Sequence, residues 1–137
     1  MKKNTMLSIL LLLPVLSVSA DEGADERGKE IFTTLCMTCH KLDRSPDMVA
    51  PPVFAVKNHY LVAHPDRDDF VMHMASWLET PDVDKTLMPG AVRRFKVMPP
   101  VELTESDREA VVGFFHDTDF NEPEWYAEHY QKGHGVK

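Results

Sequence analysis

The pentapeptide Cys36-Met37-Thr38-Cys39-His40 constrains this chain more than any other stretch. Two cysteines separated by two residues and followed by histidine form the C-x-x-C-H pattern of covalent haem attachment. In a helix, Cys36, Cys39 and His40 fall at positions i, i+3 and i+4, so both sulfurs and the imidazole share one face. Each thiol can then bond one vinyl group of the porphyrin while the histidine binds the iron. The motif therefore predicts one covalent haem c, attached at Cys36 and Cys39, with His40 as an axial ligand of the iron.

Three other interpretations of the motif are a redox-active dithiol, half of a zinc site and a chance match. A dithiol of the thioredoxin type would lie beside a βαβ pattern, and structural zinc would need a second pair of Cys or His ligands at the usual spacing. The sequence has neither feature. The haem is favoured because the C-x-x-C-H pattern is specific.

The first 20 residues have the pattern of a secretory signal. Two lysines follow the first methionine, residues 6–18 form an apolar run too short to span a bilayer comfortably, and small residues precede a cleavage point after Ala20. We expect an exported, periplasmic protein with no stable membrane insertion after cleavage; an uncleaved anchor is the alternative. The mature chain, residues 21–137, is long enough for a single domain with one core.

The net charge restricts the partners. The sequence has 15 basic and 22 acidic residues. Because Lys2 and Lys3 leave with the signal, the mature chain keeps 13 basic and 22 acidic residues, a net charge of −9. Nucleic-acid binding is disfavoured because phosphate contacts need clustered Lys and Arg. We expect redox partner proteins with basic docking surfaces. No disulfide is expected, since the haem motif uses both cysteines.

The spacing of apolar residues predicts an all-α fold, because no stretch alternates with a period of two. The clearest apolar stripe lies in residues 65–79, where Met72 and Met74 are expected to fill the core rather than to bind iron. Gly28 costs its helix about 1 kcal/mol relative to alanine, which indicates close approach of another group or a tolerated surface glycine. Thr104 is the expected N-cap of a later helix. The predicted helices span residues 24–36, 53–63, 65–79 and 105–117, with a short one from about Pro123.

Residues 80–103 are expected to form a long loop, and such a loop in a small domain is usually functional. It carries two Met-Pro pairs, Met88-Pro89 and Met98-Pro99, with Arg93 and Arg94 between them. Because a guanidinium matches carboxylate geometry, either arginine is a candidate for a hydrogen bond to a haem propionate. The alternative is that both are solvated loop charges.

The haem motif, Met98-Pro99 and the closing helix together resemble a class I monohaem c-type cytochrome. The resemblance covers nearly all of the mature chain, in order. It implies a cytochrome c-like domain of helices and loops wrapped around one haem, with the N- and C-terminal helices crossing at close range. The extension from about residue 119 lies beyond the family's usual ending. The residues that would form the helix crossing are Gly28, Phe32, and Phe114 or Phe115.

The same resemblance implies a set of ligands. A carbonyl near Pro51 would accept a hydrogen bond from His40. Met98 is the expected second axial ligand because Met98-Pro99 stands six residues before Thr104, whereas Met88, the alternative, stands sixteen before it. A further alternative is one of the isolated histidines: His59, His64, His73, His116, His129 or His134.

The resemblance implies an electron carrier that turns over no substrate, since both axial positions of the iron would be filled. One alternative is the haem-bearing subunit of a periplasmic dehydrogenase or oxidase complex, with Trp125, Tyr126 and Tyr130 as its contact surface or, otherwise, as a local core. A thiol-disulfide oxidoreductase would need free sulfurs. A gas-binding sensor or small peroxidase would need an open position on the iron.

Overall fold

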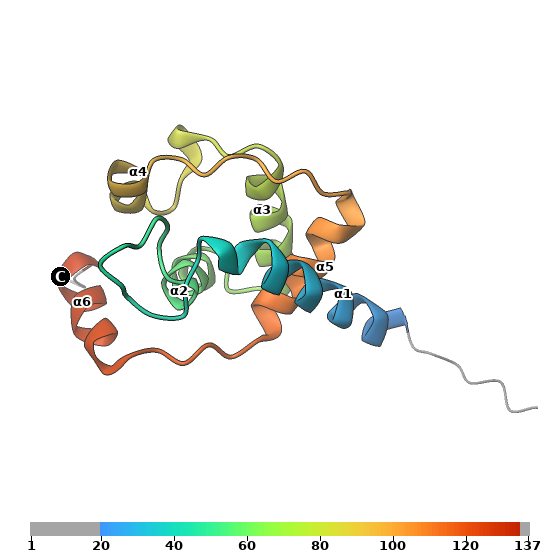
Figure 1. The fold of residues 1–137 in the computed structure, drawn as a ribbon, viewed down its shortest axis with the longest axis horizontal. Helices are drawn as coiled ribbons and strands as arrows, with labels where there is room; N and C mark the ends of the chain where they lie inside the picture. Colours follow the sequence, from blue (N-terminus) through green and yellow to red (C-terminus); the bar gives the residue numbers. More distant parts are fainter. Residues whose placement is uncertain (1–19, 135–137) are drawn as a thin grey trace, which may run out of the picture.

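The computed structural model describes residues 20–134, which are mostly helical and contain no strand, so the all-α prediction is confirmed (Figure 1). The expected signal, apart from Ala20, lies outside the described residues. Within the described part, no helix has the length and apolarity needed to cross a membrane. The elements in chain order are α1 (Ala20–Thr34), η1 (Cys36–Thr38), α2 (Val53–Ala63), α3 (Arg67–Glu79), η2 (Val83–Lys85), α4 (Pro89–Phe95), α5 (Glu105–Asp117) and α6 (Glu124–His134).

Helices α1 and α5 cross at close range and form the frame of the molecule (Figure 1). A Cβ atom on Gly28 would lie 2.2 Å from the carbonyl oxygen of Ala110 and 2.7 Å from the Cβ of Phe114. Next to this crossing, the ring of Phe32 lies 5.6 Å from that of Phe114 and 5.7 Å from that of Phe115, measured between centroids. Gly28 is therefore required by the approach of two backbones, and the surface-glycine alternative is wrong.

Helix α3 packs against α5 and begins at Arg67 rather than at the predicted Pro65. Asp66 is its N-cap, because its carboxylate accepts hydrogen bonds from the N–H groups two and three residues further on. Met74 is buried in the core, as expected. Met72 is 57% exposed, so the prediction that it fills the core is wrong.

The predicted loop over residues 80–103 contains a 3-10 turn, η2, and a short helix, α4. Pro89 occupies the first turn of α4, where its missing N–H is not needed. The helix ends at Phe95, and the C-cap residue Lys96 has a positive φ of 71°. None of the seven residues of α4 is buried. The next helix starts as predicted, since Thr104 Oγ1 accepts a hydrogen bond of 3.1 Å from the N–H of Asp107.

Helix α6 forms a second, smaller core with α2. Tyr126 is buried, and its ring lies 4.7 Å from that of Phe54. Trp125 and Tyr130 are half-buried against the same cluster. The aromatic residues of the extension therefore pack inside the protein, which is the local-core alternative rather than a free contact surface.

Candidate functional site

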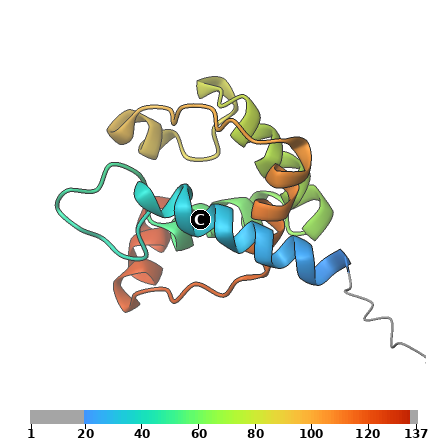
Figure 2. The same cartoon turned by 45° about the vertical axis from the view of Figure 1, so that its right-hand side comes forward.

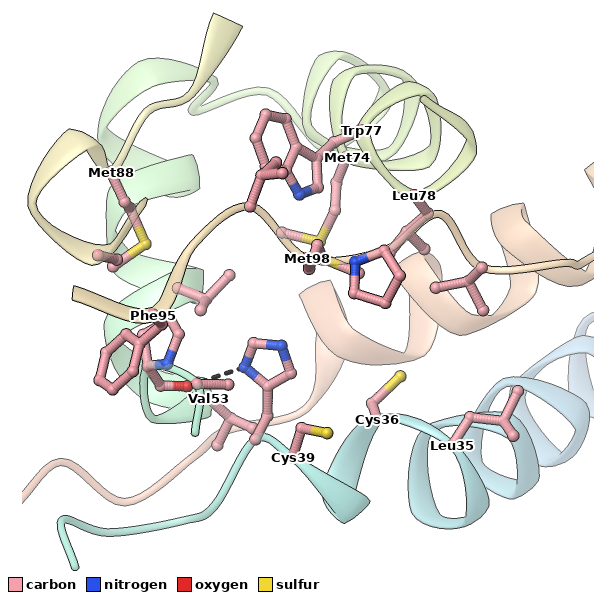
Figure 3. A pocket seen from close by; sticks show the side chains of 18 of the residues that line it. Leu35, Cys36, Cys39, Val53, Met74, Trp77, Leu78, Met88, Phe95 and Met98 are labelled. Carbon is pink, nitrogen blue, oxygen red and sulfur yellow. Dashed lines mark hydrogen bonds between the residues drawn. The ribbon is translucent and has the colours of Figure 1, made fainter. Parts of the chain in front are cut away.

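The haem motif forms a tight turn directly after α1. The N–H groups of Cys39 and His40 donate hydrogen bonds of 3.2 and 2.9 Å to the carbonyl oxygen of Cys36. The turn η1 is a 3-10 helix, whereas the sequence predicted that α1 would continue to Cys36. Cys36, Cys39 and His40 nevertheless line one cavity together, as the spacing predicts. Figure 3 shows the two sulfurs on the same wall of this cavity.

The imidazole of His40 is fixed by one hydrogen bond. Its Nδ1 lies 2.8 Å from the carbonyl oxygen of Pro51, the bond that the resemblance implied (Figure 3). A second hydrogen bond closes the same loop next to this one, because the N–H of Val53 donates to the carbonyl oxygen of Lys41 over 3.0 Å. Since Nδ1 donates to Pro51, Nε2 carries the lone pair that a metal requires.

The same histidine is kept neutral by its surroundings. Burial lowers the pKa of His40 below its ordinary value, and the hydrogen bond to Pro51 opposes part of that shift. A neutral imidazole is the form that binds a metal. The site therefore presents a metal ligand in the correct protonation state at neutral pH.

The cavity has a volume of about 610 Å³, within the range of cofactor sites. Its walls come from η1, the end of α1, one face of α2, parts of α3 and α5, and α4 with the segment that follows it. Figure 2 shows α4 and residues 96–103 on one side, facing α1 and α2. The walls are mainly apolar, and their large side chains include Phe32, Tyr60, Trp77, Leu78, Phe95 and Phe115.

Three methionines line the cavity. Met98 belongs to the extended segment between α4 and α5, and in Figure 3 it lies on the wall opposite the cysteines, with Met74 of α3 nearby in the view. Met88 lies at the start of α4, where its N–H donates a 3.1 Å hydrogen bond to Thr86 Oγ1. The role of Met74 in this wall was missed from the sequence, because its position in an apolar stripe indicates a core residue equally well.

Several candidates from the sequence do not reach this cavity. Arg93 and Arg94 are exposed on α4 and line a second cavity instead. Among the histidines whose side chains the structure describes, His40 alone lines the first cavity. His134 lies outside the described side chains. A contact between either arginine and a haem propionate stays a prediction. Neither arginine side chain lines the first cavity.

The chemistry of the site fits a haem better than a dithiol or zinc. Burial raises the pKa of the Cys36 thiol to about 11, whereas reactive dithiols have lowered thiol pKa values. In residues 20–134 no three His, Cys, Asp or Glu side chains are grouped so as to hold a metal ion. An apolar cavity with one neutral imidazole and thioether sulfurs matches the donor set of a c-type haem iron.

A helical domain that closes an apolar cavity over a C-x-x-C-H turn defines the class of c-type haem proteins. The family model of cytochrome c matches residues 26–119, which is more than half of the chain. The chain therefore belongs to the cytochrome c family, whose members bind haem c covalently through this motif and serve in electron transfer. The match ends before α6. Neither the search of curated proteins nor that of solved structures found a match.

Proposed function

We propose that the protein is a periplasmic electron carrier, not an enzyme, that holds one haem c through Cys36 and Cys39, with His40 and Met98 as the axial ligands. The observation that carries this proposal is the fixed, neutral imidazole of His40 in an apolar cavity whose opposite wall presents a thioether sulfur. When bound, the haem supplies a one-electron couple between ferric and ferrous iron.

Pro51 sets the behaviour of His40. Its carbonyl accepts the Nδ1 proton, so the ring keeps one tautomer and one orientation. The same hydrogen bond increases the basicity of Nε2, which strengthens the bond to a metal. Little reorganisation of the protein is then needed when one electron arrives or leaves.

The remaining walls would shield a bound haem from water and so raise its reduction potential. Apolar side chains from α3, α5 and the 96–103 segment surround the cavity, and a dry site favours the less charged ferrous state. A neutral thioether opposite histidine acts in the same direction. With His40 and Met98 both bound to the iron, no coordination position would be left for a substrate.

Met98 is a better ligand candidate than Met88 on two structural grounds. Met98 lies in an extended segment, and Pro99 and Pro100 restrict the backbone that presents it. Met88 is the N-cap residue of α4, so its backbone is held by the helix, and its side chain also lines the second cavity. The hypothesis of a haem-bearing subunit in a larger complex stays an alternative, which size-exclusion chromatography of native periplasm would separate from a free carrier.

The experiment that tests the ligand set compares Met98→Ala, Met88→Ala and the control Met72→Ala. We expect the weak charge-transfer band of ferric iron-thioether ligation to disappear only in Met98→Ala, because Met72 is exposed and outside the cavity. Loss in Met88→Ala with retention in Met98→Ala would reverse the assignment. Retention in all three would reject thioether ligation from this loop.

Localisation is tested separately. We expect the haem-stained protein in the periplasmic fraction, with Asp21 at its N-terminus, because the predicted cleavage follows Ala20. A membrane-bound chain that begins at Met1 would instead support the uncleaved anchor.

A further inference from the structure

A second cavity of about 550 Å³ lies between α4, α6 and the loop of residues 41–52. In Figure 1 these three segments lie along the same side of the molecule. We call this cavity the arginine hollow, because a guanidinium from the loop and two from α4 line it beside aromatic rings. Its defining residues are Arg44, Arg93, Arg94, Phe95, Trp125 and Tyr126.

The charge of the arginine hollow is opposite to that of the chain. No aspartate or glutamate lines it, although acidic residues outnumber basic ones by 22 to 15 in the sequence. The carboxylates of its own elements, such as Asp43 and Glu124, lie outside its lining. The guanidiniums in the lining are therefore closer to a ligand inside the cavity than these carboxylates are.

The three guanidiniums have no carboxylate partner within the described residues. None of the ion pairs there includes Arg44, Arg93 or Arg94. Two of them lie over aromatic rings instead: Arg44 is 4.8 Å from the centroid of Trp125, and Arg94 is 4.9 Å from that of Phe95. Stacking leaves the N–H edges of a guanidinium free to bind a carboxylate in a bidentate manner.

The arginine hollow adjoins the proposed haem cavity. Pro51, Met88, Ala91 and Phe95 line both cavities, so a single layer of side chains separates them. One wall of the hollow comes from α6, which lies beyond the residues that match the cytochrome c family. One wall of the hollow is therefore specific to this chain's extension, and another is shared with the proposed haem cavity.

We propose that the arginine hollow is the docking site for an acidic segment of the redox partner, whose carboxylates pair with Arg44, Arg93 and Arg94. This inference rests on the proposed electron-carrier function. Net charge predicts a partner with a basic surface, but the local charge and the position beside the haem cavity favour carboxylates at this point. Docking there brings the partner's acceptor to the shared wall, and one electron passes from the reduced protein to the oxidised partner.

The test is a titration of the reduced, isotope-labelled holoprotein with a hexaglutamate peptide, followed by nuclear magnetic resonance. We expect saturable shifts of the Trp125 indole N–H and of the arginine Nε–H groups of the hollow at low salt, and their loss at high salt. Hexalysine should not produce them. Equal shifts with hexalysine, or hexaglutamate shifts centred elsewhere, would overturn the proposal.

A matched pair of variants separates the hollow from general charge. Arg93→Gln with Arg94→Gln should weaken hexaglutamate binding by about tenfold or more. Lys29→Gln with Lys85→Gln removes the same charge outside both cavities and should change binding by less than about threefold. An unchanged haem spectrum shows that each variant is folded. Equal losses in the two pairs would reject a specific site.

Oxidation by ferricyanide gives a second readout, in which each ferricyanide accepts one electron and becomes ferrocyanide. The double Arg→Gln variant should react more slowly than the double Lys→Gln variant. This difference in rate should vanish at high salt. A protein that binds hexaglutamate in the hollow but shows no reversible redox couple would contradict the proposed function alone. A reversible couple without hexaglutamate binding would contradict the docking site alone.

Discussion

The two sides of the proposed haem cavity are built on different principles. On the frame side, α5 buries Val111, Val112, Gly113 and Phe115 against other helices. On the other side, α4 buries none of its residues, and its apolar side chains face the cavity instead. The frame thus has a protein core of its own, whereas the apolar side chains of α4 have the cavity in place of a core. A cofactor in that cavity would supply the packing contacts that α4 lacks, whereas α5 is already packed against other helices.

Loss of the haem should have the largest effect on stability, and it should destabilise α4 more than α5. Without the haem, the mainly apolar walls of the cavity would be exposed to water, and the domain would lose much of its buried apolar surface. We expect the variant with Cys36→Ser and Cys39→Ser to carry no haem and to lose cooperative thermal unfolding. Circular dichroism measures the transition, and hydrogen exchange should show that α4 loses protection before α5.

The control for that experiment is Met98→Ala, which keeps both attachment points. It should retain covalent haem on a denaturing gel and a cooperative transition. A cooperative transition with protected α4 amides in the haem-free variant would show that α4 folds without the haem.

The next largest effect should come from the helix crossing in the frame. Gly28→Ala places a methyl group 2.2 Å from the carbonyl oxygen of Ala110, a backbone atom that cannot rotate away. We expect the two helices to separate and the free energy of unfolding to fall by about 3 kcal/mol. Denaturant unfolding of the holoprotein measures this loss.

Gly23 offers a matched control on the same helix, because nothing lies within 4 Å of the position of its Cβ. Gly23→Ala should raise stability by up to about 1 kcal/mol through helix propensity. Similar losses in the two variants would mean that the close approach at Gly28 does not limit the packing of the frame.

The smallest effect should come from an ion pair on the surface that joins α3 to α5 of the frame. Arg67 lies 2.7 Å from Asp117 and lowers the pKa of that carboxyl from 3.8 to about 2, with a smaller contribution from His116. The stabilisation is therefore present above pH 3.8 and is lost as the pH falls toward 2. Because both side chains are half-exposed, we expect no more than about 1 kcal/mol.

Unfolding measured between pH 5 and pH 2 checks this expectation. Asp117→Asn should remove that part of the pH dependence, whereas Glu109→Gln, at an exposed position of the same helix, should leave it in place. The same pH dependence in both variants would assign the effect to other carboxyls.

Local physical rules predicted several helix boundaries well. Helix α2 has the predicted bounds, and α5 starts at the predicted cap of Thr104, because capping and proline effects act within a few residues. The contact at Gly28 was one of two interpretations, since a glycine alone does not reveal what approaches it. The hydrogen bond from His40 to Pro51 came from the family resemblance rather than from spacing.

The segment that contains α4 was harder to predict, for a physical reason. Helix α4 buries nothing against the protein, so it has no apolar stripe to recognise, and Pro89-Gly90 resembles a turn. Once these residues are helical, Arg93 and Arg94 leave the cavity and line the arginine hollow. The net charge likewise describes the whole chain, so it could not predict a local cluster of arginines.

The loop between His40 and Pro51 is pinned at its base by the bonds from His40 to Pro51 and from Val53 to Lys41. Doubling the length of a flexible loop adds only about 0.6 kcal/mol of closure entropy. Insertions near Arg44 would therefore be inexpensive and would leave the proximal histidine in place. A change in the length of this loop could therefore alter the lining of the arginine hollow at Arg44 without moving His40.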